Sequence, residues 1–521
     1  MDQFRANVWF GNIVWFAVFR AFNSLVFMSE NPVSAPPSET TQPARALSLL
    51  DATMIVIGSM IGSGIFIVSA DVARNLGAPG YVLGAWVVTG IVTLIAALSY
   101  GELAGMMPRA GGQYVYLQEA YNPLVGFLFG WTTFLVVETG TIAAVATAFA
   151  TYTGVLLPWF SADNVLFKPF GLTISSVQLL AVAVIVLLTA INLRGVREAK
   201  FVQLIFTLTK TTALLGLVVL GIAVGVNEDF WSLNRSVFWE TFRTDVVDGA
   251  VKITPLAGWP LLTAIGLAMV GPLFSSSAWN NITFTAAEVK DPRRSIPLSL
   301  FFGTLTVSVL YILANVTYQM LLPVKGDPNG ADEVARGIMF ATNGRVGTAA
   351  AAQIFGTVAT IIMAMFILIS TFGCNNGIIL AGARVSYAMA RDGLFFRKAG
   401  SLNRHGVPGF ALGIQCVWAG LLCLSGTYGQ LLDYTVFVIL IFYILTIGGV
   451  FILRRRRPDA PRPYRAFGYP VLPALYMVFS VLLCLDLLWF KPVTSSAGLI
   501  IVALGIPVFW LWRRKRAGLR G

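Results

Sequence analysis

Twelve long apolar stretches constrain the fold of this chain more than any other feature of its sequence. Each is long enough for a helix that crosses a bilayer, which takes about 20 mostly apolar residues. The stretches cover residues 52–75, 80–106, 124–156, 173–192, 199–225, 258–287, 298–323, 346–383, 408–425, 429–453, 470–490 and 495–512. Only 12% of the 521 residues are charged, about half the usual share in soluble domains. The sequence therefore predicts an all-α polytopic membrane protein with twelve transmembrane helices.

The Lys and Arg residues predict the orientation of these helices. When the loops are assigned to alternate sides, the side that carries both ends of the helical core holds most of the basic residues, including 454–457 and 513–520. Cytoplasmic loops carry an excess of Lys and Arg. We therefore expect a cell (inner) membrane protein with both core termini in the cytoplasm. The net charge of +12 then reflects membrane anchoring, and we expect no nucleic acid partner.

The residue types leave little material for a metal site or for enzyme chemistry. All four cysteines lie in apolar stretches, at Cys374, Cys416, Cys423 and Cys484, and His405 is the single histidine. This pattern predicts neither a disulfide framework nor a zinc site. We expect no metal, no cofactor, no catalytic residues and no enzymatic activity.

Residues 1–47 precede the helical core as an N-terminal extension and tail. Residues 30–46 are rich in Pro, Ser and Thr, a composition typical of a flexible linker. Residues 8–28 are apolar and admit three interpretations. A cleaved signal peptide would reverse the charge bias, an interfacial helix is the second, and the third is a natural start at Met28. We favour the third, in which residues 1–27 lie upstream of the natural protein.

Two apolar stretches contain residues that interrupt a helix. Residues 58–66 read Gly-Ser-Met-Ile-Gly-Ser-Gly-Ile-Phe, and glycine is both unfavourable in helices and permissive of other conformations. Residues 274–280, in the sixth stretch, read Phe-Ser-Ser-Ser-Ala-Trp-Asn. Unwinding at membrane depth is tolerated only where protein, water or ligand meets the freed backbone groups. Helix packing through small residues explains either stretch alone, but the pair indicates a transporter's substrate site.

The two interruptions have the chemistry that an amino acid zwitterion needs. Free N–H groups at the start of a half-helix attract a carboxylate, and carbonyls at the end of one attract an ammonium. The N–H groups of Ser63, Gly64 and Ile65 are the candidates for the carboxylate. The candidate substrate-binding residues are Ile61, Ser63, Gly64, Ile65, Phe274, Ser275 and Ser277.

Two ionisable residues lie within apolar stretches. Glu138 is near the middle of the third stretch, where an acid normally faces the bundle interior or a cavity; a protonated or hydrogen-bonded packing carboxyl is the alternative. Lys210 lies in the fifth stretch and either snorkels to the interface or is a buried ammonium. A buried ammonium would supply the positive charge that a bound cation supplies elsewhere. A desolvated lysine can also release its proton, so proton coupling stays open.

Several motifs resemble those of the amino acid–polyamine–organocation superfamily. They are residues 61–66, the Pro-Arg-Ala-Gly-Gly turn at 108–112 and residues 274–280, while 196–203 and 206–210 are similar to its L-type amino acid transporter branch. The resemblance extends from residue 48 to 469. It implies an alternating-access permease or exchanger for small or neutral amino acids, with the leucine-transporter fold. This fold has two inverted repeats of five helices, here followed by two C-terminal helices.

The resemblance also implies a domain division and two gating or coupling roles. Lys210 takes the place of a structural sodium ion and reaches hydroxyls such as those of Ser370 or Thr371, and Phe274 is an external lid. Glu138 is a coupling candidate on its depth alone, because a protonated carboxyl there could carry a proton. The division is 1–47 for the extension, 48–225 for the first repeat, 226–257 for an external loop, 258–453 for the second repeat and 454–521 for the C-terminal part.

This chain differs from the L-type branch in two ways. The branch usually has Phe-Ala-Tyr-Gly-Gly-Trp-Asn at 274–280, so the missing tyrosine and added hydroxyls alter the pocket. The external loop at 159–171 has no cysteine, so we expect no disulfide-linked heavy chain. A cationic amino acid or polyamine transporter that uses Glu138, and a non-transporting sensor on the same scaffold, are the alternatives. Exchange, proton symport and uniport stay open.

Overall fold

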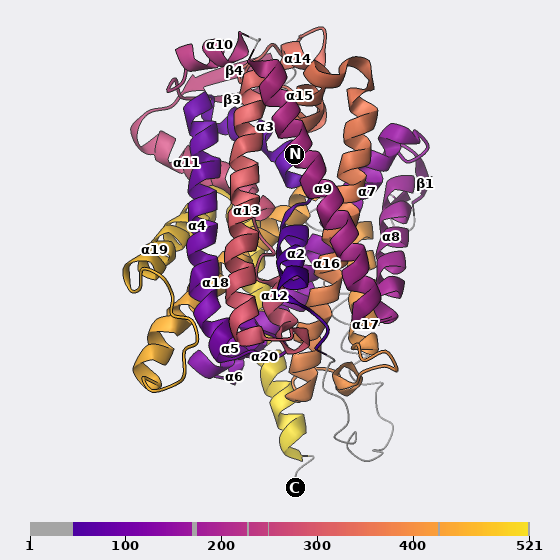
Figure 1. The fold of residues 1–521 in the computed structure, drawn as a ribbon, viewed down its shortest axis with the longest axis vertical. Coiled ribbons are helices and arrows are strands. Elements are labelled where there is room, and N and C mark those ends of the chain that lie inside the picture. Colours follow the sequence, from indigo (N-terminus) through magenta and orange to yellow (C-terminus); the bar gives the residue numbers. More distant parts are fainter. Residues whose placement is uncertain (1–44, 169–173, 227–228, 248–249, 426–427, 519–521) are drawn as a thin grey trace.

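The computed structural model forms an elongated bundle of helices (Figure 1). It describes residues 45–168, 174–226, 229–247, 250–425 and 428–518. The apolar segment at 8–28 and the tail up to residue 44 lie outside the described residues. A hairpin and the short helix α10 (Phe230–Ser236) lie at one end of the bundle, and the C-terminus lies at the other.

The helices follow the predicted stretches closely. The first half contains α2 (Leu49–Met60), α3 (Gly64–Leu76), α4 (Pro79–Met106), α5 (Gln113–Ala120), α6 (Pro123–Thr132), α7 (Glu138–Leu156), α8 (Ser176–Leu193) and α9 (Val196–Gly225). The second half contains α11 (Gly258–Ser275), α12 (Asn281–Phe284), α13 (Pro292–Leu321), α14 (Glu333–Arg336), α15 (Val346–Phe355), α16 (Ala359–Arg391), α17 (Gly409–Ser425), α18 (Tyr428–Arg456), α19 (Val471–Phe490) and α20 (Pro492–Gly518).

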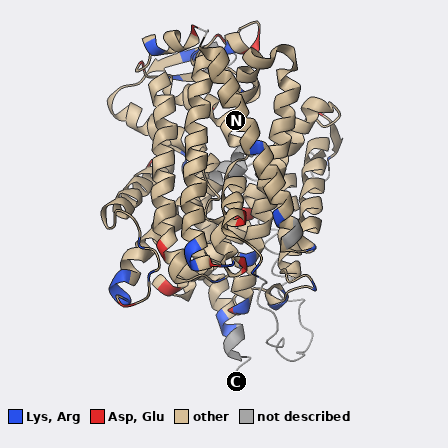
Figure 2. Cartoon of the chain, in the orientation of Figure 1, with Lys and Arg blue, Asp and Glu red and all other residues tan. Residues whose placement is uncertain are grey.

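The prediction of an all-α polytopic membrane protein is confirmed. Within the described ranges, ten helices are long and apolar enough to span a membrane, and the pair α2 and α3, bent by 42°, makes an eleventh. The shorter apolar helix α17 completes the twelve predicted stretches. Charged residues gather toward the two ends of the bundle and are sparse between them (Figure 2), as lipid requires of a spanning surface.

The packing of the helices brings the two interrupted stretches together. α3 packs against α11, α2 packs against α13 and α9, and α16 packs against α7, α9 and α2. The two interruptions, one between α2 and α3 and the other after α11, therefore lie side by side in the interior. The long helices around them hold them there.

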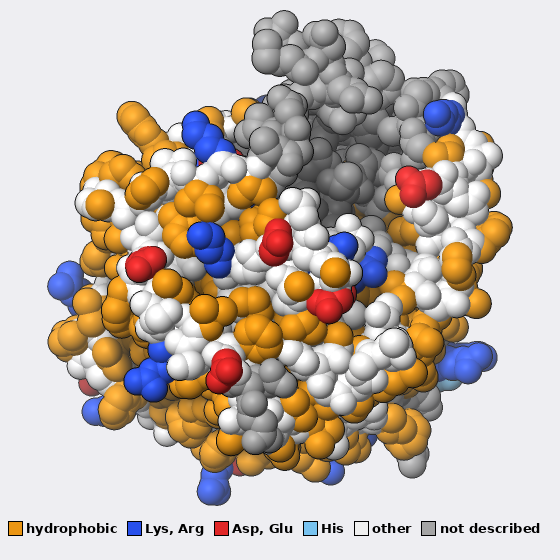
Figure 3. All heavy atoms as spheres, turned by 90° about the horizontal axis from the view of Figure 1, so that it is seen from above, with side chains coloured by type: hydrophobic (Ala, Val, Ile, Leu, Met, Phe, Trp, Pro, Cys, Tyr) orange, Lys and Arg blue, Asp and Glu red, His pale blue; other side chains and the backbone are white. Residues whose placement is uncertain are grey.

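The predicted external loop at 226–257 contains regular structure that the sequence did not indicate. After α10, strands β3 (Phe242–Val247) and β4 (Ala250–Pro255) pair in antiparallel register, from Phe242 opposite Pro255 to Val247 opposite Ala250. β3 packs on α3, where the Phe242 ring lies against Gly77. Seen from this end, the molecule presents scattered charges among apolar and polar groups (Figure 3).

Buried ion pairs hold the opposite end of the bundle, which carries the predicted cytoplasmic loops. Glu102 of α4 is 1% exposed and accepts from Arg454 at 2.6 Å and from Arg462 at 3.2 Å. Arg384 of α16 donates to Glu288 at 3.0 Å, with both side chains buried. Removing one member of such a pair leaves a buried charge unpaired, which is strongly destabilising. These pairs therefore hold α4, α16 and the loop before α19 in place.

Candidate functional site

The first interruption exposes the carbonyls of residues 58–62, and an ammonium lies among them. Lys210 of α9 is 3% exposed, and its Nζ donates to the carbonyls of Gly58 at 2.5 Å and Ile61 at 2.6 Å. The same Nζ reaches the Ser370 carbonyl of α16 at 3.3 Å. Lys210 is thus a buried ammonium that joins three helices, and it does not snorkel to the interface.

Side chains of α16 satisfy more of these carbonyls. The Ser370 hydroxyl lies 3.1 Å from the Ile61 carbonyl and 3.0 Å from the Gly62 carbonyl. One helical turn further, the Cys374 thiol donates to the Ser59 carbonyl at 3.0 Å. Buried backbone carbonyls without a partner are costly, so this ring of donors stabilises the unwound segment.

A tyrosine connects the first interruption to the second. The Tyr311 hydroxyl of α13 lies 3.1 Å from the Met60 carbonyl and 3.3 Å from the Ser275 carbonyl. α11 ends at Ser275, and the chain continues through a non-helical segment, where Ala278 has a φ of 66°, before α12 begins at Asn281. The sequence therefore located both breaks correctly, and Tyr311 lies between them.

The two breaks are in contact at Gly64 and Ser275. A β-carbon added at Gly64 would lie 2.7 Å from the Ser275 β-carbon and nearer still to its hydroxyl. Gly64 begins α3, and the N–H groups of a helix's first turn have no partner within the helix. The free N–H groups that begin at Gly64 therefore lie beside the end of α11, as the zwitterion hypothesis requires.

A cavity lies beside the second break, on the side of α7 and α12. It is lined by Gln113, Phe129, Thr133, Val137, Glu138, Thr141, Ser277, Ala278, Asn280, Asn281, Phe284, Ile378, Ile439, Phe442 and Tyr443. Glu138 starts α7 directly after the π-helical turn η1 (Thr133–Val137), and such turns occur frequently at functional sites. Its Oε2 atom has no hydrogen-bond partner among the described residues. Glu138 therefore faces a cavity, which was one of its two interpretations.

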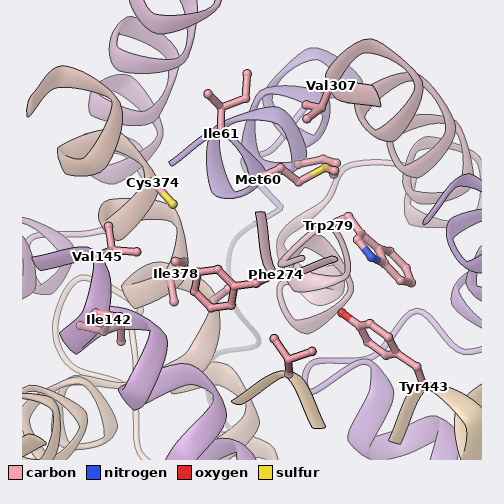
Figure 4. Packing of buried hydrophobic residues seen from close by; sticks show 14 of the residues in the cluster. Met60, Ile61, Ile142, Val145, Phe274, Trp279, Val307, Cys374, Ile378 and Tyr443 are labelled. Atoms are coloured by element: carbon pink, nitrogen blue, oxygen red, sulfur yellow. The ribbon is translucent and has the colours of Figure 1, made fainter. Parts of the chain in front are cut away.

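A second cavity, walled largely by apolar residues, adjoins the first at Ser277, Ile439 and Tyr443. Phe274 lines it and is 8% exposed. In Figure 4 the Phe274 ring points from α11 toward Ile378 of α16. Phe274 thus forms part of the wall of the second cavity, on the side of α11 that faces α16.

Comparison with known proteins identifies the family. The family model described as amino acid permease matches residues 47–512. The chain belongs to the amino acid permease family. This permease is therefore a multi-pass membrane transporter and not an enzyme, as its sequence predicted. In the part of the chain that the structure describes, no group of three or more His, Cys, Asp or Glu residues could hold a metal ion.

Individual relatives cover nearly the whole permease. Large neutral amino acids transporter small subunit 2 of Mus musculus is 30% identical over 90% of this chain and 82% of its own length. Asc-type amino acid transporter 1 of Mus musculus is 29% identical over 92% of this chain and 83% of its own. The serine/threonine exchanger SteT of Bacillus subtilis is 28% identical over 91% of this chain and 98% of its own.

Lys210 does not contact the hydroxyl groups that were expected to be its partners on α16. The Thr371 hydroxyl of the permease donates to the Ile367 carbonyl of its own helix at 2.7 Å, a common bond for threonine in a helix. Ser370 does contact Lys210, but through its carbonyl. The Ser370 hydroxyl donates to the unwound segment instead.

Sequence reasoning missed a chain of polar side chains beside the second break. Asn280 donates to Gln113 Oε1 at 2.9 Å and accepts from the Tyr443 hydroxyl at 3.0 Å. Gln113 also donates to Thr446 Oγ1 at 2.9 Å. Gln113 follows the Pro-Arg-Ala-Gly-Gly turn and Asn280 ends the second interruption, so their positions were a usable signal. Nothing in the sequence distinguishes Tyr443 from the other aromatic residues of α18.

Proposed function

We propose that this permease moves small or neutral amino acids by alternating access, without sodium, and that the Lys210 ammonium replaces a structural sodium ion. The observation that carries the proposal is the pair of short bonds from Lys210 Nζ to the Gly58 and Ile61 carbonyls. A cation among unwound carbonyls at mid-membrane is the arrangement of sodium sites in transporters with broken helices. The names of the relatives, two amino acid transporters and a serine/threonine exchanger, support amino acid transport and favour exchange as its mode.

In this proposal the two breaks hold the substrate's backbone end. The carboxylate binds the N–H groups of Ser63, Gly64 and Ile65, where the helix dipole of α3 is positive. The ammonium binds carbonyls at the end of α11, namely those of Phe274, Ser275 and Ser277. Gly64 and Ser275 are in van der Waals reach of each other, so a single small zwitterion can engage both breaks at once.

The arrangement in the membrane is also part of the proposal. Both core termini lie in the cytoplasm of the inner membrane, and residues 48–225 and 258–453 form the two inverted repeats. Residues 454–521 add the basic loop and the last two helices. The external loop at 159–171 contains no cysteine, so the proposal includes no disulfide-linked heavy chain.

The test of this proposal is uptake in proteoliposomes with sodium replaced by choline. We expect the initial rate for a panel of labelled neutral amino acids to be unchanged within about twofold, because the ammonium is covalently present and needs no ion to replace it. Vesicles preloaded with unlabelled amino acid should accelerate uptake if the permease is an exchanger. Uptake that collapses in choline would mean that a sodium site exists and that Lys210 does not occupy it.

A prediction for Phe274 tests its role as an external lid. We expect Phe274→Ala to reduce transport by about tenfold or more and Phe274→Trp to reduce it less, since closing an aromatic lid excludes water and commits the substrate. Initial uptake rates are compared at equal amounts of reconstituted protein. The matched control is Phe302→Ala, because Phe302 is 48% exposed on α13. Equal rates for Phe274→Ala and wild type would contradict the lid role.

A further inference from the structure

The cavity beside α7 is lined by several buried polar groups that have no hydrogen-bond partner among the described residues. Glu138 Oε2, Thr133 Oγ1 and both amide atoms of Asn281 have no hydrogen-bond partner among the described residues. These three side chains are 6%, 2% and 1% exposed, so bulk water does not satisfy them. All three residues line the cavity. Buried polar groups in native proteins nearly always have partners, so a cluster of unpaired ones indicates a ligand.

The other polar wall of the cavity is different, because its side chains already bind one another. Asn280 is bonded to Gln113 and to Tyr443, and Gln113 is bonded to Thr446 as well. The unpaired atoms are therefore confined to the face formed by η1, the start of α7 and the start of α12. A ligand that enters the cavity meets its hydrogen-bonding partners on that face.

The unpaired groups determine which ligand chemistry fits. The Glu138 carboxyl oxygen and the Asn281 amide oxygen accept hydrogen bonds, the Thr133 hydroxyl accepts or donates, and the Asn281 amide nitrogen donates. Acceptors therefore outnumber the one obligate donor, and a ligand group with a donor, such as a hydroxyl or an amide, satisfies them. No Lys, Arg or His is among the described residues that line the cavity. An acidic ligand group would therefore lack a cationic partner. An apolar group would leave the buried atoms unpaired, which costs binding free energy.

We propose that the side chain of the transported amino acid enters this cavity and that it ends in a hydrogen-bond donor. The donor is a hydroxyl, an amide or a cationic nitrogen. This inference rests on the proposed function, in which carbonyls of the second break hold the substrate's ammonium. Ser277 is one of those residues and also lines the cavity, so a side chain attached to that ammonium's α-carbon is within reach of it.

The test compares amino acids of similar size as competitors of labelled uptake in proteoliposomes. Threonine and valine differ by a hydroxyl in place of a methyl group, and glutamine and methionine form a second pair. We expect threonine and glutamine to compete about tenfold or more better than valine and methionine, because a site built for a donor rejects the analogue without it. Glutamate should compete poorly.

Variants of the cavity wall link that preference to the unpaired groups. Thr133→Val combined with Asn281→Leu keeps the number and branching of the side-chain heavy atoms and removes three of the four unpaired atoms, so the preference for threonine over valine should disappear. Thr132→Val is the matched control, because the Thr132 hydroxyl donates to Leu128 of its own helix and Thr132 is not among the cavity residues. It should keep the preference.

Glu138→Gln distinguishes the possible donors. If lysine competes in wild type and this variant removes competition by lysine alone, the donor is a cation bound by the carboxylate. If threonine and glutamine compete and lysine does not, the donor is a neutral hydroxyl or amide. Either result sustains the proposal. Equal competition by threonine and valine in wild type overturns it, and so does a preference that survives in the double variant.

Thermal stabilisation of the purified protein distinguishes a failure of the proposed transport function from a failure of the side-chain inference. Threonine should raise the unfolding temperature of wild type more than valine does, and the difference should vanish in the double variant even if that variant transports poorly. A wild type that neither takes up nor is stabilised by any amino acid would overturn the proposed function itself. A wild type that transports but ignores the side-chain donor overturns the present inference alone.

Discussion

Lys210→Ala is expected to reduce amino acid uptake by about a hundredfold while the protein still reaches the membrane. The Gly58 and Ile61 carbonyls each lose a short bond to a charged donor. The Ile61 carbonyl keeps the Ser370 hydroxyl as a neutral partner, whereas the Gly58 carbonyl is left without its donor, and a buried acceptor left unsatisfied costs roughly 1–3 kcal/mol. Both carbonyls lie in the segment that must present the substrate site. Initial uptake rates in proteoliposomes, normalised to reconstituted protein, measure the effect.

Two further variants make this result specific to the ammonium. Lys210→Arg should also transport poorly, because a planar guanidinium does not fit a space that holds a compact point charge. Thr209→Ala should transport like wild type, because Thr209 is the adjacent, exposed residue and its hydroxyl donates to the Ile205 carbonyl of its own helix. Near-normal uptake by a well-reconstituted Lys210→Ala would show that the ammonium is dispensable.

The fold could be predicted from the sequence because apolar length and composition determine whether a segment spans a membrane. The exceptions are short elements. Strands β3 and β4 formed where only a loop was expected, and Phe242 of β3 docks against Gly77 at the end of α3. A contact between segments so far apart in the chain leaves no local signal in either one.

The candidate site could be predicted only in part, for a related reason. Glycines at 62 and 64 reveal that a helix is interrupted, since glycine has a backbone preference of its own. The partners of the freed carbonyls depend on how neighbouring helices are rotated. Ser370 and Thr371 are adjacent on α16, about 100° apart around the helix axis, and only Ser370 donates to the first interruption. Tyr311 could not be predicted as a site residue, because its sequence position does not distinguish it from the many other aromatic residues in the apolar stretches.

The structure distinguishes the environments of Glu138 and Lys210, the two ionisable residues whose roles the sequence left open. From the sequence, Glu138 was either a packing carboxyl or a cavity residue. In the structure its Oε2 is unpaired beside an equally unpaired Asn281, whereas Lys210, with the same uncertainty, is fully engaged by backbone carbonyls. The two ionisable groups therefore have different roles: Lys210 maintains the unwound backbone, and Glu138 is available to a ligand.

Gly64→Val is the second substitution with a large expected effect, and we expect it to abolish uptake. Even a single β-carbon at Gly64 would lie 2.7 Å from the Ser275 β-carbon and 3.3 Å from its α-carbon. Valine adds two methyl groups at this point, so the breaks must separate, and the side chain occupies the space where the α3 N–H groups would meet a carboxylate. Membrane abundance should be near normal, because most of the bundle packs elsewhere.

Two companion variants show whether the contact with Ser275 is the cause. Gly62→Ala should keep most of the uptake, because the nearest atom to a β-carbon there is the Cys374 sulfur, at 3.4 Å. Gly64→Ala should transport poorly, and adding Ser275→Gly, which removes the atoms that collide, should restore part of its activity. If Gly64→Val transports normally at wild-type abundance, or if Gly62→Ala is equally damaging, then close approach of the breaks at Gly64 is not what the substrate site requires.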